Sequence, residues 1–366
     1  MGNDMPNIYV TLMIKDWVIP VPIIQGGMGV GVSLAPLAAA VANCGGVGTI
    51  SSAGLDLLVS ERVGRKVDHY EAMRLEVELA RSLSPNGIIA VNIMFALQKS
   101  YADSVRGAID AGANIIISGA GLPLNLPSIQ NPGKTALVPI VSSARALEII
   151  CRKWEAQNYR PNAVILEGPK AGGHLGFKQE EIDDPNFSLE NLLPAVKAVA
   201  KKYGDFPVIA AGGIYDRADI LRFLDLGANG VQMGTRFLAT KESSASEIYK
   251  QAVVNARKED IIIATKLQSP CLMLFRTILQ SPMYQNGNLS PCSKGHVMQK
   301  DPTTGCLTKC LAKDCPTKYF CICNGLFNSG GHQSNPSQNL YTVGTEAYRV
   351  TEIVSAKSVI DEIKPW

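Results

Sequence analysis

The chain has 366 residues, of which 46% are hydrophobic and 18% are charged. That is enough to bury a large core, and it lies within the range of a single α/β barrel. The 35 basic and 32 acidic residues give a net charge of +3 and form no dense basic block, which argues against nucleic acid or an anionic membrane surface as a partner. No secretory leader and no run of about 18 apolar residues is found. We therefore expect a cytoplasmic protein that acts on a small molecule.

Short apolar runs alternate with helical patterns along the first two thirds of the chain. The predicted strands are 18–28, 47–54, 87–95, 114–121, 136–143, 163–169, 206–213 and 230–237. Runs that are apolar on both faces are typical of parallel strands covered on both sides. Eight such β/α units predict a closed TIM barrel, with an open doubly wound sheet as the alternative.

The segments between the strands carry helical periodicity and helix-start residues. Residues 68–83 place apolar side chains on one stripe, and Asp216 can cap the helix that follows it. Ser244 and Glu247 have the spacing of a capping box, which predicts that a further helix begins there.

Residues 257–366 exceed what the eighth unit needs. We predict a TIM barrel over residues 1–256 and a C-terminal extension over 257–366. Within the extension, about 285–339 is rich in Asn, Gly, Ser, Pro and Cys and predicts a loop excursion that packs on the barrel, and about 354–363 predicts a terminal helix.

Six of the nine cysteines fall within residues 292–323. In a chain without a secretory leader, such a cluster favours free thiols or a metal site over a disulfide framework. Their spacings match no zinc ribbon or ferredoxin pattern. Two interpretations remain: reduced thiols in a covering loop, or a structural zinc or iron–sulfur site. The ligands preferred for the metal site are Cys306, Cys310, Cys315 and Cys321.

The predicted strands end in small or polar residues, where a structural core would carry bulky apolar ones. Gly212 and Gly213 follow the seventh strand, and Gly234 and Thr235 follow the eighth, which are the standard phosphate-binding positions of a TIM barrel. The alternative is that these glycines only form tight turns. The run Gly27–Gly31 reads Gly-x-Gly-x-Gly and therefore does not match a dinucleotide fingerprint.

His174 lies in the glycine-rich run EGPKAGGHLG just beyond the sixth strand. A histidine in a glycine-lined pocket can act as an acid or a base near neutral pH. The alternative is a loop histidine that bonds a backbone carbonyl.

Six motifs in order, PIIQGGMGVGVS, AVNIMFAL, SGAGLP, EGPKAGGHLG, PVIAAGGI and VQMGTRF, resemble the nitronate monooxygenase family. That family was formerly called 2-nitropropane dioxygenase and includes flavin-type enoyl-acyl-carrier-protein reductases. The resemblance implies an FMN-binding TIM barrel with His174 on the substrate side of the flavin. The positions it implies for FMN contact are Gly26, Gly27, Met28, Asn92, Glu167, Gly172, Gly173, Gly212, Gly213, Gln232, Met233, Gly234 and Thr235. The segment SPCLMLFRTI departs from the family's glycine-rich pattern, since Leu272 and Phe275 replace smaller residues and reshape the substrate mouth.

Three functions follow from the resemblance and the motifs. The first is oxidation of alkyl nitronates by FMN and O₂, with His174 orienting the nitronate or deprotonating a nitroalkane. The second is reduction of an enoyl thioester or quinone, with NAD(P)H as the electron donor. The third is a regulatory barrel that has lost turnover, which the intact AGGH run argues against. The oligomeric state is left open, with a homodimer as one candidate.

Overall fold

The computed structural model describes residues 11–264, 274–286, 322–332 and 335–366. Eight parallel strands follow one another in chain order around a closed barrel, and the last pairs with the first. They are β3 (Ile23–Gln25), β4 (Val47–Ser51), β5 (Ile88–Met94), β6 (Ile115–Gly119), β7 (Ala136–Val141), β8 (Val164–Glu167), β10 (Val208–Ala211) and β11 (Gly230–Met233). The prediction of a TIM barrel is confirmed, and the open-sheet alternative is wrong.

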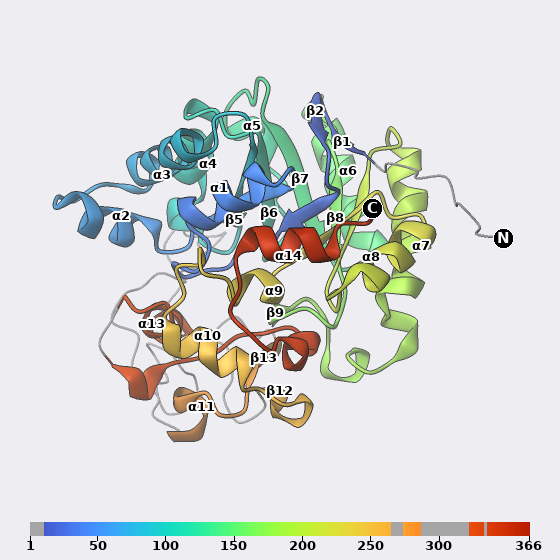
Figure 1. Cartoon of the computed structure of the whole chain (residues 1–366). Coiled ribbons are helices and arrows are strands. Elements are labelled where there is room, and N and C mark those ends of the chain that lie inside the picture. Colours follow the sequence, from blue (N-terminus) through green and yellow to red (C-terminus); the bar gives the residue numbers. More distant parts are fainter. Residues whose placement is uncertain (1–10, 265–273, 287–321, 333–334) are drawn as a thin grey trace, which may run out of the picture.

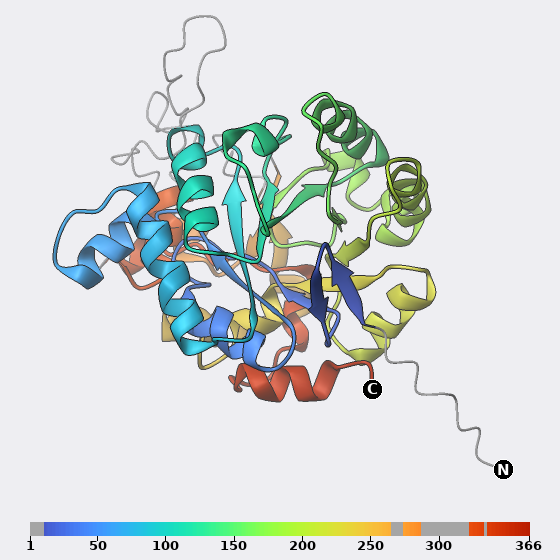
Figure 2. The same cartoon turned by 90° about the horizontal axis from the view of Figure 1, so that it is seen from above.

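Helices surround the strands, as the view along the barrel shows (Figure 2). They are α1 (Ala35–Asn43), α2 (Leu55–Val63), α3 (His69–Leu83), α4 (Gln98–Asp110), α5 (Leu126–Ile129), α6 (Ala144–Glu155), α7 (Leu189–Lys202), α8 (Arg217–Asp225) and α9 (Thr235–Leu238). The predicted helix at 68–83 is α3, whose N-terminus is capped by the Asp68 side chain. Asp216 caps α8 as predicted.

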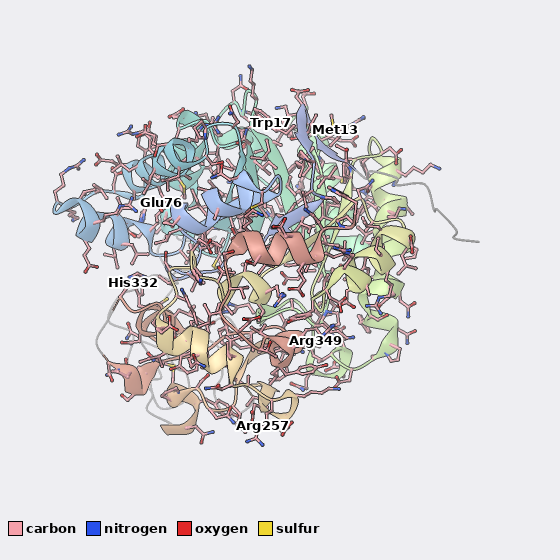
Figure 3. The ribbon with its side chains drawn as sticks, viewed as in Figure 1. Met13, Trp17, Glu76, Arg257, His332 and Arg349 are labelled. Atoms are coloured by element: carbon pink, nitrogen blue, oxygen red, sulfur yellow. The ribbon has the colours of Figure 1, made fainter. Side chains whose placement is uncertain are left out.

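The N-terminal segment forms an antiparallel hairpin that closes one end of the barrel (Figure 1). Its strands are β1 (Leu12–Ile14) and β2 (Trp17–Ile19). Leu12, Ile14 and Ile19 pack into the barrel interior, whereas Met13 is 47% exposed at the outer edge (Figure 3). The single strand predicted over 18–28 is therefore wrong. Two prolines interrupt the run, and proline cannot donate a ladder hydrogen bond, so the chain turns between β2 and β3.

Two further boundaries differ from the sequence predictions. The last barrel strand ends at Met233, because residues 235–238 turn into α9 instead of continuing the strand to Phe237. The next helix, α10 (Glu247–Val254), is capped by Ser246, whose hydroxyl accepts a hydrogen bond from the Tyr249 N–H. The predicted capping box of Ser244 and Glu247 is therefore wrong, and a simple cap lies two residues later, at Ser246.

Most of the described elements after α10 cover the opposite end of the barrel from the hairpin (Figure 1). A three-stranded antiparallel sheet joins β9 (Gly173–Leu175) to β13 (Leu274–Ile278) and β12 (Ile261–Ile263). The other described elements at this end are α11 (Pro282–Asn286) and α13 (Ile322–Ser329), whereas α14 (Ala356–Ile363) packs on the side of the barrel against α1 and α8. The short 3-10 helices are η1 (Gln179–Glu181), η2 (Pro185–Phe187), η3 (Lys258–Asp260), η4 (Pro336–Gln338) and η5 (Thr345–Arg349).

The terminal helix α14 begins at Ala356, two residues later than predicted, because Ser355 caps it. Its buried side chains Val359, Ile360 and Ile363 join the main core between the strands and the helices. The division of the chain at residue 256 stays a prediction. Within the described ranges, no helix is both long and apolar enough to cross a membrane.

Candidate active site

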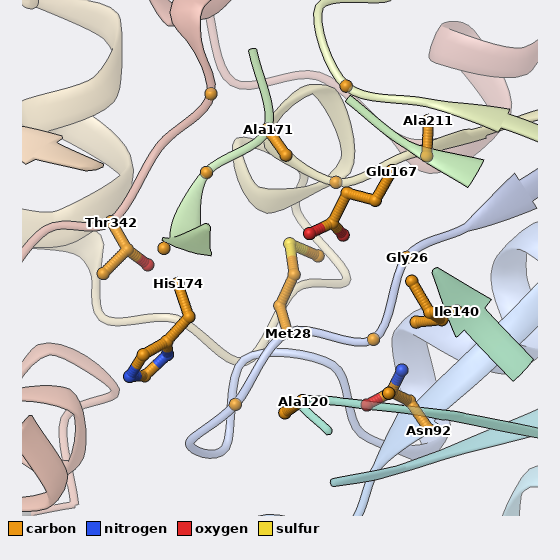
Figure 4. Close-up of a pocket in the computed structure, with 18 of the residues that line it drawn as sticks. Gly26, Met28, Asn92, Ala120, Ile140, Glu167, Ala171, His174, Ala211 and Thr342 are labelled. Carbon is orange, nitrogen blue, oxygen red and sulfur yellow. The ribbon is translucent and has the colours of Figure 1, made fainter. Parts of the chain in front are cut away.

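A cavity of about 520 Å³ opens at the carboxyl ends of the barrel strands, where TIM-barrel enzymes carry their active sites. Ligand pockets typically span about 300–1,000 Å³. Every residue that the sequence predicted for cofactor contact or catalysis lines this cavity. In Figure 4 the side chains of Met28 and Glu167 point toward its middle, and His174 lies at one end. The assignment of these predicted residues to FMN binding or to catalysis stays a prediction.

The turn after β3 forms one wall, and at Gly27 it leaves no space for a side chain. A Cβ atom at Gly27 would overlap the side chain of Asn92 from β5. Asn92 is 9% exposed, and no hydrogen bond of its amide to a described residue is found. The amide can therefore serve a ligand that lies on the bare backbone of Gly27.

The ends of β10 and β11 form a second wall. Gly212 and Gly213 have φ values of 98° and 77°, a left-handed conformation that glycine adopts without the steric cost of a side chain. Gly344 N–H donates to Thr235 Oγ1 at 2.9 Å, which leaves the Thr235 hydroxyl proton free for another acceptor. Backbone N–H groups and a hydroxyl at this position suit a phosphate group.

The segment from Thr342 to Glu346 closes this end of the cavity. Beside it, the ring of Tyr215 lies between two guanidinium groups, with Arg236 at 4.6 Å and Arg349 at 4.3 Å from its centroid. The Tyr215 hydroxyl donates to the Arg349 carbonyl and accepts from Arg236. The C-terminal extension is thereby fixed to the end of the site that suits a single phosphate.

Two polar side chains face the middle of the cavity. Gln232 is 8% exposed, and its Oε1 has no hydrogen-bond partner among the described residues. Glu167, at the end of β8, makes no hydrogen bond or ion pair to any described residue. Burial raises the pKa of Glu167 to about 7, since a carboxylate without a counter-charge is costly to desolvate. Both groups are therefore available to hydrogen-bond a bound molecule.

The loop between β8 and β9 is fixed by a buried arginine that the sequence analysis did not single out. Arg276 donates from Nη1 to the carbonyls of Pro169 and Ala171, at 2.6 and 2.5 Å. Arg276 is 4% exposed, and burial lowers its pKa to about 10. Gly172 lies against the backbone of Val343 and Gly344, where any side chain would clash.

His174 is carried by β9 and is held by its neighbour on β13. It pairs with Phe275 across the two strands, and the two rings meet edge to face with 4.9 Å between their centroids. Its Nε2 has no hydrogen-bond partner in the described part of the chain. Burial lowers the pKa of His174 to about 4. The imidazole is therefore uncharged at neutral pH.

The sequence analysis missed the apolar roof of the cavity. Helix α13 contributes Ile322, Leu326 and Phe327, and it falls in the segment predicted as a loop excursion. The apolar run ICNGLF was the signal that could have predicted a buried helix there. Five residues of the sequence analysis lie outside the described residues: Leu272 and the candidate metal ligands Cys306, Cys310, Cys315 and Cys321. The metal site therefore stays a prediction.

A closed parallel barrel with a glycine-walled cavity and a half-buried histidine at its carboxyl end defines a TIM-barrel enzyme. The sequence matches the family described as nitronate monooxygenase over residues 11–365. The chain therefore belongs to the nitronate monooxygenase family of oxidoreductases.

Relatives and solved structures agree with this family. A "probable nitronate monooxygenase" of Staphylococcus aureus (strain Newman) is 29% identical over 275 residues, covering 66% of this chain and 71% of the relative. FabK from Thermotoga maritima superposes with a TM-score of 0.69 at 25% identity, covering 94% of this chain and 92% of that one. Nitroalkane oxidase from Streptomyces ansochromogenes has a TM-score of 0.66 at 21% identity with 94% of each chain covered, a likeness that shows the fold alone.

Proposed function

We propose that the chain is an FMN-dependent oxidoreductase that oxidises alkyl nitronates with O₂ to a carbonyl compound and nitrite. The observation that carries this proposal is one cavity that unites a glycine-walled cradle with a half-buried, uncharged His174. Family membership supports the same activity.

The residues of the cavity fit FMN. Gly27 and Gly172 line the cavity and carry no side chain, so a flat ring can approach their backbone closely. Asn92 and Gln232 present polar groups without a partner among the described residues. Gly213 and Thr235 would hold the single phosphate. When bound, FMN supplies the electron acceptor for the reaction, and the protein binds and orients both molecules.

The charge state of His174 favours nitronate oxidation over thioester reduction. A nitronate is already an anion, so it needs no base, and an uncharged imidazole can donate an N–H hydrogen bond to its oxygens. Reduction of an enoyl thioester instead needs a proton donor, and a histidine whose pKa is lowered to about 4 carries no extra proton at neutral pH. Glu167, with a pKa near 7, could supply that proton only if it reached the substrate.

Reduction of an enoyl thioester or quinone is the second candidate, with NAD(P)H as the donor. The likeness to FabK from Thermotoga maritima, at 25% identity over 94% of this chain, keeps this candidate open. A homodimer and a cytoplasmic location remain predictions.

One experiment separates the two activities. Flavin-loaded protein is mixed with propyl 1-nitronate under air, and nitrite is measured. A second sample is mixed anaerobically with NADH, then with crotonyl thioester, while the flavin absorbance is followed. We expect nitrite at many turnovers per flavin and slow bleaching by NADH. Rapid bleaching that crotonyl thioester reverses, without nitrite in the first sample, contradicts the proposal and supports the reductase.

A further inference from the structure

Arg276 is a buried cation beside the loop between β8 and β9, and the proposed reaction does not use it. It lies on β13, opposite Gly173 of β9 in the antiparallel pair, and does not itself line the cavity. Burial lowers its pKa to about 10, and the charge of Asp183 only partly offsets that effect. The guanidinium is therefore protonated at neutral pH, although no ion pair with a carboxylate of the described ranges holds it. A buried charge of this kind is costly and must be stabilised by other polar groups.

The polar groups that stabilise this charge are two carbonyls of the loop. Arg276 donates from the same nitrogen, Nη1, to the carbonyls of Pro169 and Ala171. The carbonyl between them, that of Lys170, accepts instead from the Thr345 N–H at 3.1 Å. Hydrogen bonds from a charged donor are about twice as strong as those between neutral groups. One guanidinium nitrogen therefore fixes the direction of two peptide groups in this loop.

The direction of the second of these peptide groups decides where the Gly172 N–H points. A trans peptide group directs its N–H opposite to its C=O, and the peptide bond between Ala171 and Gly172 is trans. Because the Ala171 carbonyl points toward Arg276, the Gly172 N–H points away from Arg276. No hydrogen bond from this N–H to a described residue is found, and Gly172 lines the cavity. The N–H is therefore available to a bound molecule.

Gly172 lies at the end of the cavity that suits a phosphate. A Cβ atom built on Gly344 would lie 3.4 Å from Thr235 Oγ1 and 3.8 Å from the Gly172 nitrogen, so these two atoms flank the same residue. On the other side, a Cβ atom built on Gly212 would lie 3.0 Å from the Ala171 nitrogen. The loop that Arg276 holds therefore borders both the glycines after β10 and the hydroxyl after β11.

We propose that Arg276 is a positioning residue that holds the Gly172 N–H toward the phosphate end of the cavity, where it binds the phosphate of FMN. This inference rests on the FMN site of the proposed function and not on the nitronate reaction. The positive charge at the Ala171 oxygen also polarises the peptide group and strengthens the N–H at its other end as a donor. A phosphate dianion gains from both effects, whereas a flavin without a phosphate gains from neither.

The test compares FMN with riboflavin, which has the same ring system but no phosphate. Their dissociation constants are measured by quenching of flavin fluorescence, at a temperature where every variant is folded. We expect the wild type to bind FMN at least about a hundredfold more tightly than riboflavin, since several donors meet the phosphate. Arg276→Met should lower this ratio by about 10–100-fold, the effect of one hydrogen bond to a charged group. Arg276→Lys keeps the charge on a shorter side chain and should lower the ratio by a smaller factor.

Arg81→Met is the matched control. Arg81 also donates from Nη1 to a distant part of the chain, Asn114 Oδ1 at 3.1 Å, and does not line the cavity. It should leave the ratio of the two affinities unchanged. A purely structural role of Arg276 would weaken FMN and riboflavin by the same factor, so an Arg276→Met ratio equal to that of Arg81→Met overturns the proposal. If Arg276→Met does not fold, the ratio for Arg276→Lys decides, and a value equal to the wild type overturns the proposal.

Nitrite release from propyl 1-nitronate tests the proposed function separately. A wild type that shows the expected affinity ratio, with the fall in Arg276→Met, but forms no nitrite contradicts the nitronate reaction and supports the role of Arg276. A wild type that binds FMN no more tightly than riboflavin, or binds neither flavin, overturns the role of Arg276 whether or not nitrite is formed.

Discussion

Gly172→Ala tests how tightly the C-terminal extension is packed against the cavity. A Cβ atom at this position would lie 2.5 Å from the Val343 carbonyl carbon, 2.6 Å from the Gly344 nitrogen and 2.7 Å from the Val343 oxygen. All three are backbone atoms, so no side chain can rotate to make room. Gly172 does not have a positive φ, and alanine therefore introduces a steric contact without backbone strain.

The expected loss of stability follows from the backbone segment that the new methyl group must displace. Displacing residues 343–344 breaks two hydrogen bonds, from Gly344 N–H to Thr235 Oγ1 at 2.9 Å and from Thr345 N–H to the Lys170 carbonyl at 3.1 Å. Each is worth about 1 kcal/mol, and overpacking adds about 1–3 kcal/mol. We expect Gly172→Ala to lower the free energy of unfolding by about 3–5 kcal/mol. Because Thr235 lines the phosphate end of the cavity, the affinity for FMN should fall by at least about tenfold.

Urea unfolding measures the stability, and quenching of free flavin fluorescence measures the affinity. Gly64→Ala is the control, since Gly64 lies at the C-terminus of α2 with φ +70°, and a Cβ there would meet no atom within 4 Å. Alanine there should cost only the left-handed backbone strain, about 1–2 kcal/mol, without loss of FMN. If Gly172→Ala is no less stable than Gly64→Ala and binds FMN normally, the packing argument is refuted.

Three further predictions follow from the site and the helix caps. His174→Ala should keep FMN but lose about 10²-fold in nitronate turnover, measured as nitrite release, and full activity would reduce His174 to a loop residue. In the folded protein Glu167 keeps its proton up to about pH 7, against about 4.5 unfolded. The stability that this raised pKa provides is therefore complete below pH 4.5 and is lost as the pH rises through 7. The free energy of unfolding should change by at most about 3 kcal/mol over that range. Glu167→Gln should abolish that part of the pH dependence in urea unfolding of the flavin-free protein, and an unchanged pH profile would contradict the raised pKa. Ser246→Ala should lower the free energy of unfolding by about 1 kcal/mol, and Ser244→Ala should lower it by much less. A larger loss for Ser244→Ala would show that Ser244 caps the helix, as the sequence predicted.

The barrel could be predicted because its strands are apolar on both faces, a pattern that depends only on local sequence. Boundaries were harder to predict wherever the apolar run outlasts the strand. Phe237 and Leu238 are as apolar as Val231 and Met233 of the strand, yet they belong to α9, since only the closed barrel shows where β11 must end. Likewise, the sequence alone offers both Ser244 and Ser246 as caps, and tertiary packing selects the second.

The candidate site could be predicted where it lies on strand ends, because glycine and polar residues are unusual there. Its other walls come from parts of the chain that are distant in sequence. Arg276 reaches the carbonyls of a loop more than 100 residues earlier, and α13 brings Phe327 to the cavity from a segment with little periodicity. Residues such as Ile322, Leu326 and Phe327 could have predicted a buried helix, but which wall it covers depends on the fold, as do the contacts of Arg276.

The central claim is that this one cavity holds FMN and uses it to oxidise nitronates, and one preparation tests both parts. The purified protein is heated to release its own flavin for chromatography, and a second portion is loaded with FMN and assayed for nitrite from propyl 1-nitronate under air. We predict about one FMN per chain and nitrite formation that Gly172→Ala reduces in proportion to its loss of flavin. Released FAD, a protein that takes up no FMN, or a fully loaded protein that forms no nitrite would contradict the account.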